Sequence, residues 1–285
     1  MERILVTGFT GTVGQEAAKQ LVRWGERPRC AVRNVEKALQ QYGTEYEYAA
    51  LDFDEEATFP AALAGVGRLF LMYPPMIREK DSFARFIAAA KQHGVRHIVY
   101  LSVKDVQYLP FVPHHKNEKL IKQSGIPYTF LRAGYFTQNL NLFLLGELMK
   151  HDRIFVPAGK GKTSFTDVRD IAEIGALALL EGEKHYNKSY VPTGSEALTF
   201  FEVADIMTKV LGRRITYTNP TVKEFQTYFR QEGLEEAYLK VVTGIHLFTK
   251  IGLAKGITRD IERVTGHPPL SVRQYVEDYR AYWEK

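Results

Sequence analysis

Three glycines near the start of the chain have the spacing of a phosphate-binding turn. Gly8, Gly11 and Gly14 lie in the run Thr7-Gly8-Phe9-Thr10-Gly11-Thr12-Val13-Gly14, directly after a short apolar segment. In such a turn the first glycine permits a tight bend, the second lets the backbone approach a pyrophosphate, and the third lets a helix pack closely on a strand. A helix that begins near Thr12 adds free N–H groups and the positive end of its dipole. The run Thr7 to Gly14 therefore predicts a dinucleotide site.

Basic and polar residues follow the next apolar segment, where the adenosine ribose of a dinucleotide would lie. They are Arg33, Asn34 and Lys37. NAD sites usually place an acidic residue there for the ribose hydroxyls, whereas a guanidinium binds a 2′-phosphate with two hydrogen bonds. We expect these residues to bind NADP(H). An exposed arginine at the start of a helix would give the same pattern.

Further candidate residues follow other apolar segments. We expect Asp52 and Phe53 to lie near the adenine, although Asp52 could equally be a helix N-cap. Nearer the nicotinamide and its acceptor we expect Tyr73, Pro74, Pro75, Gly134, Tyr135, Phe136 and Asn139. Aromatic rings there suit a flat substrate, and Phe136 and Asn139 are the candidate substrate residues. Each ring could instead belong to the core.

The elements that must position these residues alternate between strands and helices. Short apolar runs predict strands at 4–6, 29–32, 46–50, 68–72, 97–101 and 128–131, and helical spacing of apolar residues separates several of them. Such alternation predicts an α/β Rossmann fold, a doubly wound parallel sheet, with the candidate residues along its carboxyl edge.

The second half of the chain predicts a smaller, helix-rich substrate lobe. We expect helices at 137–150, 168–181, 200–211, 221–249 and 270–283, and short strands near Ile154, Tyr190 and Ile215. Residues 1–150 would form the NADP(H)-binding domain, and 151–285 mainly the lobe, with segments that return to the first domain. The apolar stretch Tyr135 to Met149 could line a pocket or pack against a second subunit, so a homodimer is one of two possibilities.

Composition limits the classes of partner. The chain has 285 residues, and its 38 Lys and Arg against 33 Asp and Glu are dispersed, which suits an anionic cofactor better than a nucleic-acid surface. Cys30 is its one cysteine, so no intrachain disulfide can form. The chain begins with a strand pattern rather than a signal peptide, and no apolar run approaches the roughly 18–20 residues that span a bilayer. We expect a cytoplasmic protein without nucleic-acid or membrane partners.

Several longer motifs carry a resemblance. They are the Thr7–Gly14 run, Val32-Arg33-Asn34, Pro74-Pro75, His114-x-x-x-Glu118-Lys119-Leu120 before Ser124-Gly125, Tyr128-Thr129-Phe130-Leu131-Arg132, Tyr135-Phe136-x-x-Asn139 and Asp167-Val168-Arg169-Asp170-Ile171-Ala172. Together they resemble the NmrA-like group of atypical short-chain dehydrogenases/reductases, over about residues 1–180. The resemblance implies NADP(H) across the sheet's carboxyl edge and a small C-terminal substrate lobe. Members include NADPH-dependent quinone oxidoreductases, triphenylmethane-dye reductases and redox-sensing regulators without turnover.

The resemblance also shows a departure at the catalytic positions. The wider superfamily reduces carbonyls with a Tyr-x-x-x-Lys pair and a serine, in which tyrosine is the general acid. When Glu118 is aligned with the family's helix glutamate, the lysine position falls on His114 and the tyrosine position on Pro110. Ser102 stands at the serine position, although it could simply cap a strand end. The usual acid is therefore absent.

His114 is the remaining titratable candidate. With an ordinary pKa of about 6.5 it could donate a proton or bind ribose, or it could merely pair with Glu118 on a helix face. His114, His115 and Glu118 lack the spacing of a zinc motif, so we expect no metal. Tyr108 could also approach as an acid, but no pattern requires it.

Loss of the tyrosine changes which acceptors can be reduced. A simple ketone becomes a strongly basic alkoxide and needs a proton donor, whereas a quinone gives a delocalised anion and a triarylmethyl cation becomes neutral. The sequence therefore predicts an NADPH-dependent oxidoreductase that transfers hydride to a conjugated acceptor such as a quinone or dye. The alternative is a non-catalytic NADP(H)-sensing regulator. A sugar-nucleotide epimerase matches the architecture but needs the missing tyrosine.

Overall fold

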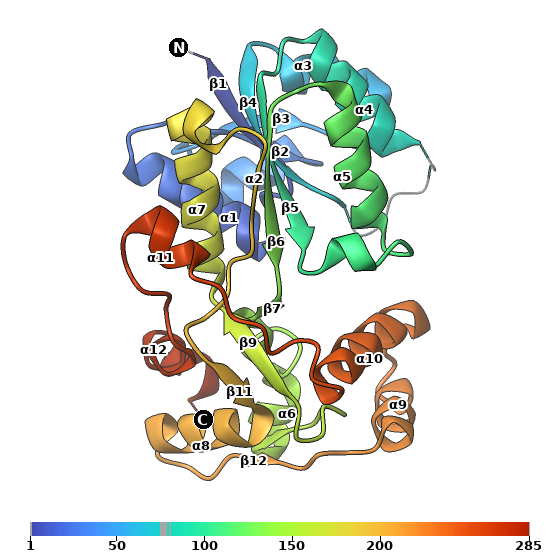
Figure 1. Ribbon diagram of the computed structural model, residues 1–285, viewed down its shortest axis with the longest axis vertical. Coiled ribbons are helices and arrows are strands. Elements are labelled where there is room, and N and C mark those ends of the chain that lie inside the picture. The colour runs from blue at the N-terminus through green and yellow to red at the C-terminus, as the bar shows by residue number, and fades with distance from the viewer. Residues whose placement is uncertain (1, 75–78, 80, 285) are drawn as a thin grey trace. The chain divides into compact units, whose positions relative to one another are not determined.

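The structure, a computed structural model, describes residues 2–74, 79 and 81–284 of the chain, which form two compact units (Figure 1). Unit 1 contains the residues up to Ala133, then 168–192 and 263–266. Unit 2 contains 134–167, 193–262 and the residues from His267 onward. The chain first passes from unit 1 to unit 2 between Ala133 and Gly134, whereas the sequence predicted a boundary at residue 150.

Unit 1 is built on a seven-stranded sheet in which every neighbouring pair is parallel. The strand order is β3-β2-β1-β4-β5-β6-β10. The strands are β1 (Arg3–Val6), β2 (Arg29–Val32), β3 (Glu47–Ala50), β4 (Val66–Met72), β5 (His97–Val103), β6 (Tyr128–Ala133) and β10 (Lys188–Tyr190). This order is that of a Rossmann fold, with its reversal between β1 and β4. The predicted fold class is confirmed.

Helices cover both faces of this sheet. On one face lie α1 (Thr12–Arg23) and α7 (Val168–Glu181), and on the other α3 (Phe59–Leu63), α4 (Ser82–Gln92) and α5 (Pro113–Ser124) (Figure 1). The helix α2 (Val35–Tyr42) connects β2 to β3. Short 3-10 turns occur at Glu56–Thr58, Val106–Tyr108 and Gly182–His185.

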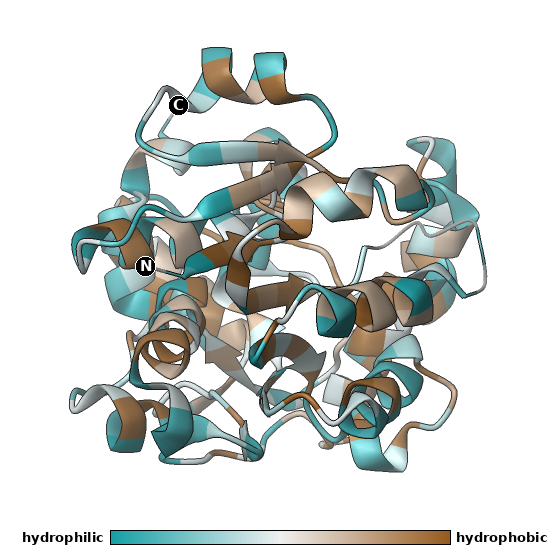
Figure 2. Ribbon diagram, turned by 90° about the horizontal axis from the view of Figure 1, so that it is seen from above, coloured by the Kyte–Doolittle hydropathy of each residue, from teal (hydrophilic) through white to brown (hydrophobic). Residues whose placement is uncertain are grey.

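The pattern of apolar residues explains why these elements form. In β4 the side chains of Leu69, Phe70 and Leu71 are fully buried, as a strand covered on both faces requires. On α1 the buried residues Val13, Ala17 and Leu21 recur every four positions, so one face of the helix packs on the sheet. Figure 2 shows brown, hydrophobic strands in the middle of the molecule and paler or teal strands toward one side.

Unit 2 contains two small sheets and several helices. Strand β9 (Lys162–Thr166) pairs antiparallel with β11 (Ala197–Thr199) and parallel with β7 (Tyr135–Phe136). Strand β8 (Arg153–Ile154) pairs with β12 (Thr216–Tyr217). The helices are α6 (Leu145–His151), α8 (Phe200–Leu211), α9 (Val222–Gln231), α10 (Glu236–Lys250) and α12 (Val272–Asp278), with 3-10 turns at Thr137–Leu140 and Arg280–Trp283. Helix α11 (Asp260–Thr265) crosses from unit 2 into unit 1.

Three predicted helices are wrong in extent. Residues 137–150 form a 3-10 turn and α6, and 270–283 form α12 followed by another 3-10 turn. The predicted helix 221–249 is two helices, because Gly233 has a φ of +80° and ends α9. There the N–H groups of Gly233 and Leu234 donate to the carbonyls of Arg230 and Phe229, a closing pattern of helix C-termini. The predicted helices 168–181 and 200–211 are confirmed, and β7, β9 and β11 were not predicted.

The apolar stretch Tyr135 to Met149 packs mainly within unit 2 itself. Leu140, Leu144 and Leu148 are fully buried and belong to a core that includes Phe200. Most of the surface expected to meet a pocket or a second subunit is therefore used inside the unit.

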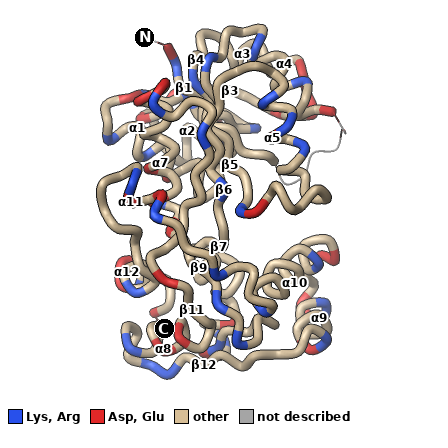
Figure 3. Tube along the Cα trace, viewed as in Figure 1, with Lys and Arg blue, Asp and Glu red and all other residues tan. Residues whose placement is uncertain are grey.

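Charged residues are dispersed over both units, as the sequence predicted (Figure 3). In this view Lys and Arg are interspersed with Asp and Glu along the described part of the trace in both units. Within the described part of the chain, no helix has both the length and the apolar character to cross a membrane.

Candidate active site

The glycine turn follows β1 directly, at the carboxyl edge of the sheet. Gly8 has a φ of +60°, which favours glycine, and a Cβ there would overlap the side chain of Met72. The Gly11 N–H donates to the Gly8 carbonyl at 2.9 Å. The Thr7 hydroxyl accepts the Met72 N–H at 2.8 Å. Backbone contacts therefore set the shape of the turn, and Thr7 joins its start to β4.

The N-terminus of α1 leaves amide groups for an anion. Gly11 is its N-cap, no side chain caps it, and its first turn contains no acidic residue. The first N–H groups of a helix lack partners within the helix, so those of Thr12, Val13 and Gly14 are available. A Cβ on Gly11 would meet one atom within 4 Å, the Gly8 carbonyl oxygen at 3.3 Å, so the space beside it is open. A Cβ on Gly14 would overlap that same carbonyl. These residues fit a pyrophosphate.

Arg33 lies one strand away from the turn, because β2 pairs with β1. Arg33 and Lys37 are both exposed, and no ion pair engages either of them among the described residues. Asn34 is the N-cap of α2, and its side-chain oxygen accepts the Lys37 N–H at 2.8 Å. This placement leaves two cations for a 2′-phosphate, and their cofactor role stays a prediction.

Asp52 and Phe53 follow β3 and differ in exposure. The Asp52 carboxylate accepts the Asp54 N–H at 3.0 Å, and the following 3-10 turn has Glu55 rather than Asp52 as its N-cap. Phe53 is 7% exposed, and its ring lies 4.7 Å from that of Phe86. The Phe53 side chain therefore belongs to the core, which leaves its backbone and the half-buried Asp52 for an adenine.

Tyr73 follows β4 and lies beside His114. Its ring centroid is 6.0 Å from the imidazole of His114 and 5.6 Å from the ring of Phe83. A cavity of about 210 Å³ opens there, with Tyr73, Phe83 and Asn117 among its lining residues. Pro74 is half-buried, and Pro75 lies outside the described residues. The two aromatic rings fit the prediction of a flat ligand.

His114 stands in the first turn of α5 and contacts a buried tyrosine. Its Nδ1 atom is 2.8 Å from the hydroxyl of Tyr100, a fully buried residue of β5. Burial lowers the pKa of His114 to about 4, although the Glu118 carboxylate raises it. At neutral pH the imidazole is therefore uncharged, and a catalytic role for it stays a prediction.

Ser102 is engaged by a buried ion pair. Its hydroxyl donates to Glu118 at 2.7 Å, and Arg132 donates to the two oxygens of that carboxylate at 3.0 and 2.7 Å. Ser102 is 2% exposed and Glu118 5% exposed. The cluster joins β5, α5 and β6, and the bonds of Glu118 go to Ser102 and Arg132 rather than to His114. A catalytic role for Ser102 stays a prediction.

The family of the chain follows from a match over most of its length. The sequence profile of the NmrA-like family matches residues 1–266, a range that includes the glycine turn and α5. This chain belongs to the NmrA-like family. The resemblance seen in its motifs is confirmed.

Named reductases are similar to this NmrA-like chain over nearly its full length. An NAD(P)H azoreductase of Xenophilus azovorans is 29% identical over 98% of both chains. The triphenylmethane reductase of Citrobacter sp., solved with NADP(H), is 25% identical with a TM-score of 0.84, over 97% of this chain and 99% of its own. The NADPH-dependent quinone oxidoreductase of Escherichia coli, solved with NADPH, is 26% identical with a TM-score of 0.85, over 96% and 99%.

The remaining predicted residues of the NmrA-like chain open unit 2. They are Gly134, Tyr135, Phe136 and Asn139. The Tyr135 hydroxyl lies 3.2 Å from Nε2 of His246, and a hydrogen bond from Asn139 reaches the same hydroxyl. Burial raises the pKa of Tyr135, which is 8% exposed. The Tyr135 side chain thus belongs to the interior of unit 2, Phe136 is half-buried, and the ligand roles of this segment stay predictions.

Sequence reasoning missed three residues around the site. Asn117 bonds to Tyr100 and Tyr100 bonds to His114, while Phe9 anchors the glycine turn, with its ring 4.9 Å from that of Tyr42. Asn117 stands three residues after His114, a spacing that places both on one helix face and could have drawn attention to it. Tyr100 gave no signal, because a tyrosine inside an apolar strand resembles ordinary core.

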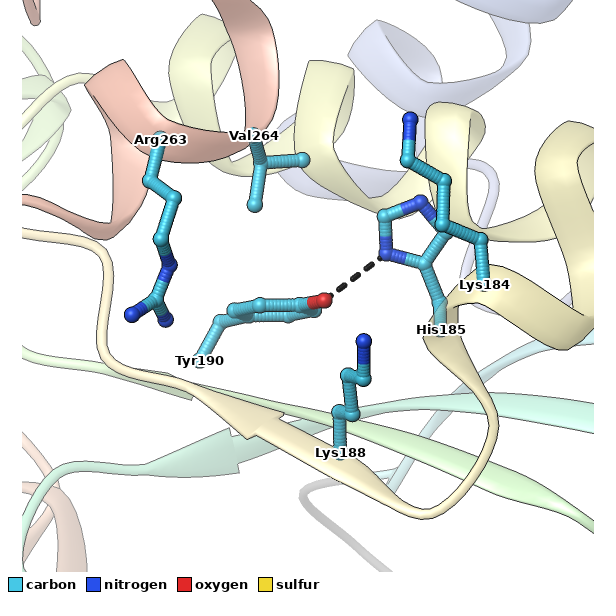
Figure 4. Close-up of a pocket in the computed structure, with 6 residues that line it drawn as sticks. All are labelled: Lys184, His185, Lys188, Tyr190, Arg263 and Val264. Atoms are coloured by element: carbon cyan, nitrogen blue, oxygen red, sulfur yellow. Dashed lines mark hydrogen bonds between the residues drawn. The ribbon is translucent and has the colours of Figure 1, made fainter.

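A second cavity, of about 150 Å³, lies in unit 1 beside β10 (Figure 4). It is lined by Lys184, His185, Lys188, Tyr190, Arg263 and Val264. His185 bonds to the Tyr190 hydroxyl at 2.8 Å and to Glu181 at 2.7 Å, and Lys184 pairs with the same carboxylate. The N–H of Asn187 donates to the carbonyl of Tyr128, which begins β6, so this cavity lies away from the sheet's carboxyl edge. It forms no part of the candidate site.

Proposed function

We propose that this NmrA-like protein is an NADPH-dependent reductase that transfers hydride to a conjugated acceptor such as a quinone or a dye. The observation that carries the proposal is the uncapped N-terminus of α1 behind the glycine turn, with exposed Arg33 one strand away. The named azo, triphenylmethane and quinone reductases support the same reaction class.

Different groups of residues bind the different parts of NADPH. The glycine turn and the first amides of α1 hold the pyrophosphate, and Arg33, Asn34 and Lys37 hold the 2′-phosphate. Asp52 and the Phe53 backbone border the adenine. Tyr73, Pro74, His114 and the segment Gly134 to Phe136 border the nicotinamide, and Phe136 and Asn139 meet the acceptor. When bound, NADPH supplies the hydride.

The environment of His114 favours acceptors that need no strong acid. Burial lowers the pKa of His114 to about 4, so no imidazolium is present at neutral pH, and Pro110 at the superfamily's tyrosine position has no proton to give. Hydride transfer to a quinone gives a hydroquinone monoanion, which then takes one proton from water. A triarylmethyl cation that accepts hydride becomes neutral and takes no proton. Neither reaction needs a proton from a tyrosine.

The test is NADPH oxidation with a panel of quinones, azo dyes and triarylmethyl dyes, run beside NADH. We expect turnover with NADPH and a lower rate for His114→Ala. Tight NADPH binding without turnover of any acceptor would refute the reductase. That result would favour the alternative, an NADP(H)-sensing regulator. This alternative is supported by Pro110, which stands at the position of the superfamily's catalytic tyrosine.

We also propose a cytoplasmic location and retain the homodimer as a proposal. Cys30 is the one cysteine of the chain and is buried, and burial raises the pKa of its thiol, which fits a protein that works without disulfides. Light scattering after size exclusion would decide the oligomeric state. Fractionation of the source cells would decide the location.

A further inference from the structure

Three residues of unit 1 form a directed chain of hydrogen bonds that ends at His114. The Asn117 side-chain N–H donates to the Tyr100 hydroxyl oxygen at 3.0 Å, and that hydroxyl lies 2.8 Å from Nδ1 of His114. Tyr100 is fully buried and Asn117 is 3% exposed. A phenol has one proton. Among the described residues this proton has no acceptor other than Nδ1 of His114, so the buried Tyr100 hydroxyl donates to that nitrogen.

This direction fixes the tautomer of the imidazole. A neutral histidine carries its proton on one ring nitrogen, and the hydrogen bond at the other nitrogen decides which. Nδ1 of His114 accepts from Tyr100, so the proton resides on Nε2. Among the described residues no hydrogen bond engages Nε2, and the side chain is half-buried beside Tyr73. An N–H donor is thereby left for a ligand at the carboxyl edge of β4 and β5.

We propose that Tyr100, oriented by Asn117, is a positioning residue that holds His114 as a neutral Nε2–H donor to the oxygen of a quinone-type acceptor. The inference rests on the proposed reductase function and narrows it to the part that each group plays. His114 is the candidate catalytic residue, whereas Tyr100 and Asn117 act through it. A neutral histidine that polarises an oxygen without becoming a cation has precedent in enzyme chemistry.

The donor divides the possible acceptors into two classes. A quinone gains negative charge on oxygen when it accepts hydride, and an N–H placed there strengthens its hydrogen bond as the charge develops. A cationic triarylmethyl dye loses its charge and presents no oxyanion. Quinone reduction therefore depends on the His114 tautomer, whereas reduction of such a dye does not.

The tautomer can be measured without any activity. Long-range ¹⁵N–¹H spectra of protein labelled in its eight histidines distinguish Nδ1–H from Nε2–H, and a His114→Gln spectrum identifies the resonances. We expect Nε2–H at neutral pH in the wild type, a mixture in Tyr100→Phe, and an intermediate ratio in Asn117→Ala. Nδ1–H in the wild type, or an unchanged spectrum in Tyr100→Phe, would overturn the proposal. If the variants do not fold, the wild-type spectrum alone decides.

Kinetics then separate positioning from a merely structural role. Tyr100→Phe should lower kcat for a quinone about 2- to 10-fold, because only part of His114 keeps Nε2–H and its orientation is no longer fixed, with KM for NADPH and the rate with a triarylmethyl dye nearly unchanged. Tyr128→Phe in β6, whose hydroxyl has no hydrogen bond among the described residues, is the matched control. Equal losses with both acceptors would overturn the positioning role. If the spectra agree but no acceptor is reduced, the tautomer assignment holds and the proposed function fails.

Discussion

Replacement of Arg33 by alanine should remove most of the preference for NADPH over NADH. The side chain is exposed, follows β2, and has no ion pair among the described residues, so its loss leaves no buried charge behind. Hydrogen bonds to charged groups contribute about 1.5–3 kcal/mol, which corresponds to about 10- to 150-fold in affinity. Because solvent and salt screen an exposed arginine, we expect about tenfold weaker NADPH binding, near the lower limit.

Calorimetric titration of both reduced coenzymes would measure this effect. NADH affinity should hardly change in Arg33→Ala, since NADH lacks the 2′-phosphate, and the NADPH affinity of the wild type should fall as salt is raised. Lys37→Ala should show a smaller loss, because an ammonium binds as a point charge. Arg23→Ala, in the last turn of α1, is the matched control for removal of a cation elsewhere. Equal wild-type affinities for NADPH and NADH, or an unchanged ratio in Arg33→Ala, would refute the assignment.

Three further predictions concern the turn and the histidines. Gly14→Ala should lower the free energy of unfolding by about 1–3 kcal/mol and weaken binding of both coenzymes, because its Cβ would overlap the Gly8 carbonyl. In urea titrations the control Gly244→Ala in α10, where a Cβ meets nothing within 4 Å, should be neutral or stabilising. Burial lowers the pKa of His97 and His246 to about 4 from 6.5, with His185 and Arg68 adding to the effect at His97. On acidification the unfolded chain takes up these protons before the folded chain does. The free energy of unfolding should therefore be at its full value above about pH 6.5 and fall by about 2 kcal/mol per histidine at about pH 5. A free energy of unfolding that rises at lower pH in urea titrations would contradict this. The rate with quinones should show no His114 inflection near pH 6.5, since Tyr73, Tyr100 and Glu118 face the imidazole and its pKa lies at about 4.

The sheet and the glycine turn could be read from sequence because their signals are local. The apolar runs at 29–32 and 68–72 coincide with β2 and most of β4, and the glycine spacing sets the turn within eight residues. Parallel pairing then follows from the alternation of strands and helices, and it brings the ends of distant strands to one edge. Arg33 and Tyr73 could be placed there without knowledge of their contacts.

Contacts between residues far apart in sequence could not be read in the same way. The hydroxyl of Ser102 bonds to Glu118, 16 residues along, and the Tyr135 hydroxyl bonds to His246, 111 residues along. No periodicity reports such pairs. The break between α9 and α10 was missed for another reason: Gly233 lies inside a continuous helical spacing of apolar residues, and its +80° φ shows only in the fold.

The surroundings of His114 are better suited to a neutral group than to the lysine that the superfamily places there. The nearest carboxylate, Glu118, already binds Arg132 through both oxygens and Ser102 through one, so it offers little to a second cation. Among the described residues the Tyr100 proton has its acceptor at position 114, and an ammonium there, which has donors and no acceptor, would leave that buried proton without a partner. Burial beside Tyr73 and Tyr100 would disfavour its charge further. An imidazole accepts the Tyr100 proton on one nitrogen and donates from the other. Under the proposed function, proline at position 110 and histidine at position 114 therefore form one chemical arrangement, with a neutral donor in place of a charged acid–base pair.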